Sequence, residues 1–219
     1  MIKRLLPILP FVIISSYYAW YNYTMNFTTL NILELLLNYV PIYIGVLLHA
    51  LTYRENNLFK KFVQSLFYVY TFCLIFYTVS LIPYHKIFTN DMLARELWVL
   101  PPYNLIPFNI FNTSVTSLNV YGNLFLLFPL GIMLPIMHKK YLSLSKFIII
   151  AFTTVLLIET VQLIATVLIG AFEPSGYQRA FDIDDFIFNC LGGLVGFFTC
   201  KFLIYPLLRI TRIDSILKV

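Results

Sequence analysis

Residues 147–169 read FIIIAFTTVLLIETVQLIATVLI, an apolar run in which Glu159 and Gln162 stand out as the strongly polar side chains. Its length matches the ~20 residues that a helix needs to cross a bilayer. The whole chain has this character, because 60% of its 219 residues are hydrophobic and only 11% are charged. A soluble domain of this size carries about a quarter charged residues. The composition therefore predicts an integral membrane protein.

Six apolar segments have the length of a membrane-spanning helix. They are residues 5–23, 31–52, 62–82, 120–137, 147–169 and 184–205. We therefore predict an all-α, polytopic helical membrane bundle with six transmembrane helices. We divide it into an N-terminal helix pair at 1–60, a four-helix unit at 61–205 and a tail at 206–219. The four-helix unit includes a long outer loop at 83–119, in which residues 90–100 have the pattern of an amphipathic surface helix.

The basic residues indicate how the helices are oriented. When the N-terminus is placed in the cytoplasm, all of the 15 Lys and Arg residues except Lys86, Arg95 and Arg179 fall in inside segments. Cytoplasmic segments of membrane proteins carry such an excess of basic residues. Both termini are therefore predicted to be cytoplasmic in a protein of the cell membrane. The net charge of +5 is explained by this pattern and does not indicate nucleic-acid binding.

Polar residues gather toward the outer face in this topology. Counting 1.5 Å per residue from Phe147 places Glu159 roughly 18 Å into a ~30 Å apolar core. Asp182, Asp185 and Asn189 are spaced three and four residues apart, which places them on one face of a helix. Charge inside a bilayer is costly and marks a functional site or a structural pairing. We predict an outward-facing polar pocket, partly covered by the outer loop and lined by Asn123, Glu159, Gln162, Arg179, Asp182, Asp185 and Asn189.

The same residues have structural interpretations, and these stay open. A neutral Glu159 can hydrogen-bond an amide side chain of another helix. Asp182 can cap the helix that follows it, and Arg179 can clamp an aspartate or bind a carboxylate or phosphate ligand. Asp182, Asp184 and Asp185 could together hold a divalent ion, but neighbouring carboxylates at a helix start are more commonly caps and solvated charge. We therefore predict no metal site and no cofactor.

Glycine and proline positions predict how two of the helices are built. Gly192 and Gly196 form a GxxxG pattern, which permits close approach of a second helix. Pro129 lies inside the span at 120–137 and should kink it, because proline frees the carbonyl of Phe125 from its helical hydrogen bond.

Four ordered motifs carry a resemblance to a known family. They are NLIPF at 104–108, GNLFLLFPLG at 122–131, ETVQ at 159–162, and RAFDIDD at 179–185 continued by NCLGG at 189–193. Their order and spacing resemble the VanZ-like family of bacterial membrane proteins, named for teicoplanin resistance, over roughly residues 68–205. The resemblance implies modest protection against lipoglycopeptides such as teicoplanin, without the enzymes that rebuild the peptidoglycan precursor.

Three functions are compatible with these residues. The first is a non-enzymatic envelope protein whose pocket binds or reorganises a lipid-linked or cell-wall component and so restricts access of the lipoglycopeptide. Its partners would be membrane lipids and a lipid-linked precursor or the lipoglycopeptide itself. The second is an intramembrane enzyme acting on a lipid-linked substrate, with Glu159 as acid or base and Asp182 or Asp185 holding a metal. The third is a small proton-coupled transporter, although the sequence has no pair of broken helices in two related halves.

Overall fold

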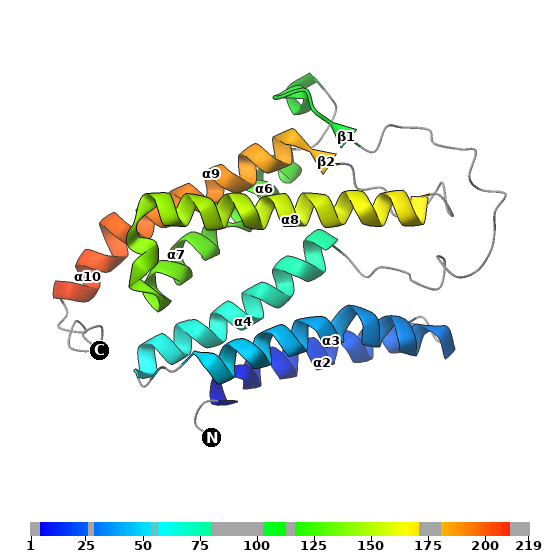
Figure 1. The fold of residues 1–219 in the computed structure, drawn as a ribbon, viewed down its shortest axis with the longest axis horizontal. Helices are drawn as coiled ribbons and strands as arrows, with labels where there is room; N and C mark the ends of the chain where they lie inside the picture. The colour runs from blue at the N-terminus through cyan, green and yellow to red at the C-terminus, as the bar shows by residue number, and fades with distance from the viewer. Residues whose placement is uncertain are drawn as a thin grey trace. The chain divides into compact units, whose positions relative to one another are not determined.

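The computed structural model describes residues 5–25, 29–53, 55, 57–79, 103–112, 117–170 and 181–210. Figure 1 shows that these residues are almost entirely helical, so the predicted all-α fold is confirmed. In chain order the elements are η1 (Leu6–Ile8), α2 (Leu9–Met25), α3 (Thr29–Thr52), α4 (Leu58–Val79), β1 (Tyr103–Asn104), η3 (Asn109–Asn112), α6 (Ser117–Leu126), α7 (Phe128–Met137), η4 (Lys139–Leu142), α8 (Leu144–Gly170), β2 (Phe181–Asp182), α9 (Ile183–Thr199), η5 (Cys200–Ile204) and α10 (Tyr205–Ile210). The two short strands pair with each other.

Five helical segments among the described residues are long and apolar enough to cross a membrane. They are Glu34–Thr52, Leu58–Val79, Asn119–Met137, Leu144–Thr166 and Ile183–Leu208. These fall on five of the six predicted spans, and they identify a membrane protein. The remaining predicted span, at 5–23, falls on η1 and the 17-residue α2, which is not among the five. The sixth span therefore stays a prediction, as does the cytoplasmic position of both termini.

The chain folds into two compact units. Unit 1 comprises residues 1–54, 71–104 and 158–181, and unit 2 comprises residues 55–70, 105–157 and 182–219. The helices α4 and α8 each contribute one end to each unit. The acidic start of α9 lies in unit 2, whereas Glu159 and Gln162 lie in unit 1.

In unit 1, rings and hydroxyl groups join α2 to α3 and α4. The ring centroid of Phe11 lies 4.8 Å from that of Tyr43 and 6.1 Å from that of Phe72. The Ser15 hydroxyl donates to the Phe11 carbonyl at 2.6 Å and lies 2.5 Å from the Tyr43 hydroxyl. Polar groups inside apolar helices need such partners because lipid offers none.

In unit 2, α6 and α7 pack on α9 through glycine (Figure 1). A Cβ atom added at Gly192 would overlap the backbone carbonyl of Leu124, and one added at Gly196 would overlap that of Phe128. The backbones therefore approach as closely as the GxxxG pattern predicts. Since Leu124 meets Gly192 and Phe128 meets Gly196, the α6–α7 segment and α9 run in the same direction.

The first turns of α8 close the other side of unit 2. The Phe147 ring stacks on the Phe197 ring with centroids 5.0 Å apart. A Cβ added at Gly193 would lie in ordinary contact with Phe147 and Ala151, at 3.6 and 3.8 Å. Phe147 of α8 meets Phe197 of α9, and Ala151, one turn later in α8, meets Gly193, one turn earlier in α9. These two segments are therefore antiparallel. Phe147, Ala151 and Phe197 are buried and form the core with Leu127.

The predicted kink at Pro129 is a complete break between two helices. The helix α6 ends at Leu126 and α7 begins at Phe128, with Leu127 between them at φ −96° and ψ 0°. The hydroxyl of Tyr70 in α4 donates to the Leu126 carbonyl at 2.8 Å. A broken helix persists at membrane depth where a neighbouring side chain satisfies its backbone in this way.

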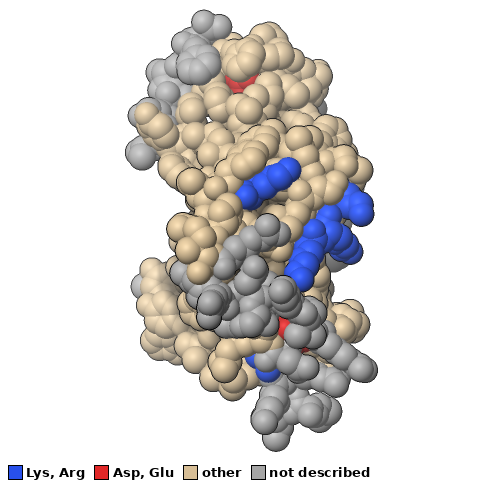
Figure 2. Space-filling view, turned by 90° about the vertical axis from the view of Figure 1, so that its left-hand side faces the viewer, with Lys and Arg blue, Asp and Glu red and all other residues tan. Residues whose placement is uncertain are grey.

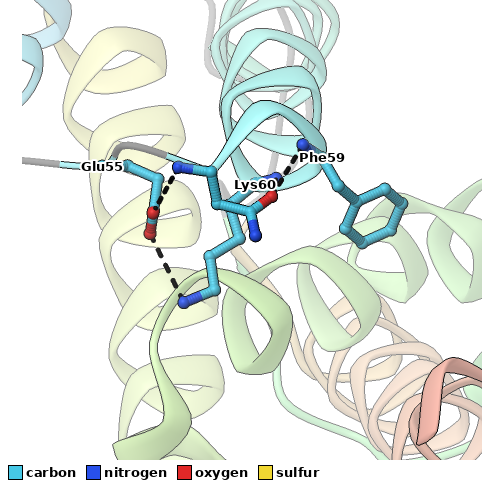
Figure 3. Close-up of polar contacts among 4 residues, drawn as sticks. Glu55, Phe59 and Lys60 are labelled. Carbon is cyan, nitrogen blue, oxygen red and sulfur yellow. Dashed lines mark hydrogen bonds and ion pairs between the residues drawn. The ribbon is translucent and has the colours of Figure 1, made fainter. Parts of the chain in front are cut away.

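The start of α4 is fixed by polar contacts within unit 2 (Figure 3). The Asn57 side chain accepts hydrogen bonds from the backbone N–H groups of Phe59 at 2.8 Å and Lys60 at 3.2 Å, which is a helix cap. The Glu55 carboxylate accepts from the Asn57 N–H at 2.9 Å and lies 3.4 Å from the Lys60 ammonium in a buried ion pair. The helix therefore begins at Leu58, earlier than the predicted start at residue 62.

Candidate functional site

The start of α9 carries three aspartates, and the first of them caps the helix. Asp182 has an extended backbone, and its carboxylate accepts the N–H of Asp184 at 2.8 Å. Asp184 and Asp185 follow in the first turn. Carboxylates are stabilised there because the first N–H groups of a helix point outward and its dipole is positive at that end. The structural interpretation of Asp182 as a cap is therefore correct.

Asp184 fastens the NLIPF segment to α9. Its side chain is fully buried, and its two carboxylate oxygens accept the backbone N–H groups of Phe108 and of Ile110, the latter at 2.8 Å. Phe108 has φ 62°, in the left-handed region that favours glycine. That conformation costs about 1–2 kcal/mol, and it lets the segment turn so that both N–H groups face one carboxylate.

The role of Asp184 was missed by the sequence analysis, which treated it as part of a solvated acidic cluster. A buried carboxylate must be hydrogen-bonded, and here its donors lie more than 70 residues earlier in the chain. The sequence does hold one signal: NLIPF and RAFDIDD are both among the family-like motifs. Nothing in their spacing shows that they meet.

Asn123 and Asp185 are brought together between α6 and α9. The Asn123 side-chain amide donates a hydrogen bond to the Asp185 carboxylate. Both residues belong to unit 2, and both are half-buried. An amide from the neighbouring helix thus supports the Asp185 carboxyl group.

Asn189 lies one turn further along α9 on the same face as Asp185. Its side chain is 1% exposed, and its carbonyl oxygen has no hydrogen-bond partner among the described residues. A buried acceptor left unpaired costs about 1–3 kcal/mol. Native structures contain few such groups, and each requires a specific explanation. The glycine contact at Gly192 begins in the next turn, so the polar part of this face ends at Asn189.

Glu159 and Gln162 lie in unit 1 and are both buried. The Gln162 side-chain amide donates to the Thr78 carbonyl of α4 at 2.6 Å, which is an interhelical hydrogen bond of the kind expected for a structural role. The position of Glu159 and Gln162 beside Asn123 and Asp185 stays a prediction.

Two parts of the predicted pocket lie outside the described residues. They are Arg179 and most of the outer loop, including the amphipathic segment at 90–100. Of that loop, the structure describes residues 103–112 and 117–119. Within the described part of the chain, no group of three or more His, Cys, Asp or Glu side chains is placed to hold a metal ion. Instead, the three aspartates of α9 act as a cap, a loop anchor and an amide partner.

Comparison with known proteins gives one match. A family model described as VanZ/LLP1 matches residues 65–205. The match includes α6 to α9 and every residue of the predicted pocket. It confirms the resemblance that the four motifs indicated. Neither the curated proteins nor the solved structures contain a match to the chain.

Proposed function

The chain belongs to the VanZ/LLP1 family, and from this premise we propose that it is a bacterial envelope protein supporting resistance to lipoglycopeptides such as teicoplanin. It would do so by binding or reorganising a lipid-linked or cell-wall component at the acidic start of α9. The five apolar helices place the protein in the membrane, where it can reach such a component. The sequence adds Glu159, Gln162 and Arg179 as predicted contributors to this site.

The buried carbonyl oxygen of Asn189 is the observation that carries the proposal. The amide of Asn123 donates to Asp185, whereas the carbonyl oxygen of Asn189 is an acceptor with no partner among the described residues. An unpaired carbonyl oxygen accepts from a ligand that supplies O–H or N–H groups. Sugar hydroxyls and amine-bearing headgroups, which are common in cell-wall precursors and lipids, have this chemistry.

The test replaces Asn189 with Leu, which is close in size and has no polar atom. Because the replacement removes an unpaired acceptor, the stability of the protein should be unchanged or about 1 kcal/mol higher. Teicoplanin protection, measured as the inhibitory concentration for cells expressing the variant, should be lost. Gln64→Leu is the matched control, since it removes a buried amide elsewhere in unit 2 that is paired with Tyr68 at 2.6 Å. That control should keep protection.

Separate variants test the predicted contributors. Glu159→Gln, Arg179→Ala and Asp185→Ala should each lower protection at normal protein levels. Full protection in Asn189→Leu cells that contain normal amounts of the protein would refute binding at Asn189. If the Glu159, Arg179 and Asp185 variants also kept full protection, the hypothesis that these residues form a binding pocket would be refuted.

A further inference from the structure

Four lysines lie at the end of unit 2 away from the aspartates of α9. Lys139 and Lys140 are in η4, Lys146 is in the first turn of α8, and Lys201 is in η5. We call these four side chains the lysine surface. In a helical geometry, Asp185 and Lys201 are separated by about 24 Å along the axis, close to the ~30 Å of a bilayer core.

Ring contacts place the lysine surface in one region. The Lys201 ammonium lies 5.6 Å from the centroid of the Phe197 ring, and that ring stacks on Phe147, the neighbour of Lys146 in α8. The short η4 leads directly into α8, and α7 ends where η4 begins. The four lysines therefore lie at the end of unit 2 where α7 turns back through η4 into α8.

The lysine surface is exposed, and no described acidic residue compensates its charge. All four side chains are exposed, and none forms an ion pair with a described residue. The first turn of α8 has no acidic residue. Lys60 behaves differently, because it is buried and paired with Glu55. Every described lysine belongs to unit 2, and basic side chains stand exposed on the face shown in Figure 2.

The surroundings of the lysine surface combine hydroxyl donors with apolar area. Ser143 and Ser145 are exposed, with their hydroxyl oxygens 3.1 Å apart. The Lys140 ammonium lies 4.8 Å from the centroid of the Tyr141 ring, as in a side chain held at a membrane interface. Phe202 and Leu203, which follow Lys201, are 63% and 60% exposed. Ammonium and hydroxyl groups suit a phosphate, and the adjoining apolar side chains suit an acyl chain.

We infer that the lysine surface binds the headgroup of an anionic phospholipid, with its acyl chains against the exposed apolar side chains of α8 and η5. Charge complementarity selects an anionic headgroup, because a zwitterionic one has no net charge to match four exposed ammonium groups. The apolar border selects a lipid over free phosphate. This inference does not depend on the proposed function, since it uses the other end of unit 2.

The experiment titrates the purified full-length protein in detergent with phosphatidylglycerol or with phosphatidylcholine of identical acyl chains, and counts bound lipids by native mass spectrometry. The wild-type protein should bind phosphatidylglycerol more tightly, and each lysine replaced by Gln should weaken that binding about fivefold. The variant with all four lysines changed to Gln should lose the preference. The variant with all four changed to Arg should keep it.

Equal binding of the two lipids by the wild-type protein would overturn the inference, as would an unchanged preference in the Gln variant. Displacement of phosphatidylglycerol by millimolar inorganic phosphate would also overturn it, because the site would then be one for free phosphate. Circular dichroism and gel filtration check that the Gln variant is folded. If it is not, Lys201→Gln and the pair Lys139→Gln with Lys140→Gln provide the same comparison.

Discussion

At the scale of single residues, the Asp184 carboxylate sets the position of a loop that precedes it by more than 70 residues. Its charge is tolerated inside the protein because two backbone N–H groups and the start of α9 surround it. Phe108 has a strained backbone conformation that turns the loop at this point. The turn directs the N–H groups of Phe108 and Ile110 at the Asp184 carboxylate. Asp184 is therefore a positioning residue for the NLIPF segment.

We expect Asp184→Asn to lower the free energy of unfolding by about 2 kcal/mol, because one of two hydrogen bonds to a charged group is lost and an amide N–H then faces a backbone N–H. Thermal unfolding in detergent measures this change. Asp182→Asn is the matched control, as it removes the same charge from the same turn but leaves a residue that caps a helix equally well. Equal losses in both variants would contradict the anchoring role.

The Glu55–Lys60 pair allows a second prediction at this scale. Both side chains are nearly buried, at 11% and 5% exposure. Breaking a buried pair leaves the Glu55 carboxylate without its cation, so Lys60→Met should cost about 3 kcal/mol. The double variant Glu55→Gln with Lys60→Met removes both charges and should be more stable than Lys60→Met alone. A double variant less stable than the single one would show that the carboxylate is well satisfied without Lys60.

At the scale of elements, the sequence predicted that α9 approaches a second helix closely, but not that the partner is the α6–α7 segment. The GxxxG pattern indicated Gly192 and Gly196, and the structure adds that Gly131 packs against the backbone of α9 in the same way. Pro129 predicted a kink in this span, and the structure has a break there between α6 and α7. The donor that satisfies the break, Tyr70, lies 56 residues away in α4 and could not be found from local pattern.

The adjacent glycines of α9 should respond differently to an added methyl group. A Cβ at Gly192 would overlap backbone atoms of Leu124, which cannot rotate away, whereas one at Gly193 would make ordinary contacts at 3.5–3.8 Å. We expect Gly192→Ala to cost about 3 kcal/mol through overpacking. Gly193→Ala should be neutral or slightly stabilising, because it also favours the helix. Thermal unfolding of the two variants checks this, and similar behaviour would contradict the close contact of α6 with α9.

At the scale of the whole molecule, the sequence predicted the membrane class and the five described spans because composition and length alone decide them. The candidate site was predicted less completely. The contact of Asn123 with Asp185 and the loop anchor at Asp184 depend on which helices are neighbours, and spacing along one helix does not contain that information. At this scale the sequence did indicate an asymmetry of charge, with acidic residues toward one membrane face and lysines toward the other. In unit 2, the aspartates and the lysine surface lie at opposite ends of α9 and η5.

This asymmetry of charge predicts that the lysine surface faces the cytoplasm, since basic residues are retained on the cytoplasmic side. Ile106, which is 66% exposed, lies near the Asp184 end, and the exposed Ser145 lies on the lysine surface. In intact cells, a membrane-impermeant maleimide should label Ile106→Cys, and it should label Ser145→Cys only after permeabilisation. The parent protein, whose three cysteines lie within apolar helices, gives the background. The reverse labelling pattern would place the acidic start of α9 in the cytoplasm, where it could not meet a lipoglycopeptide.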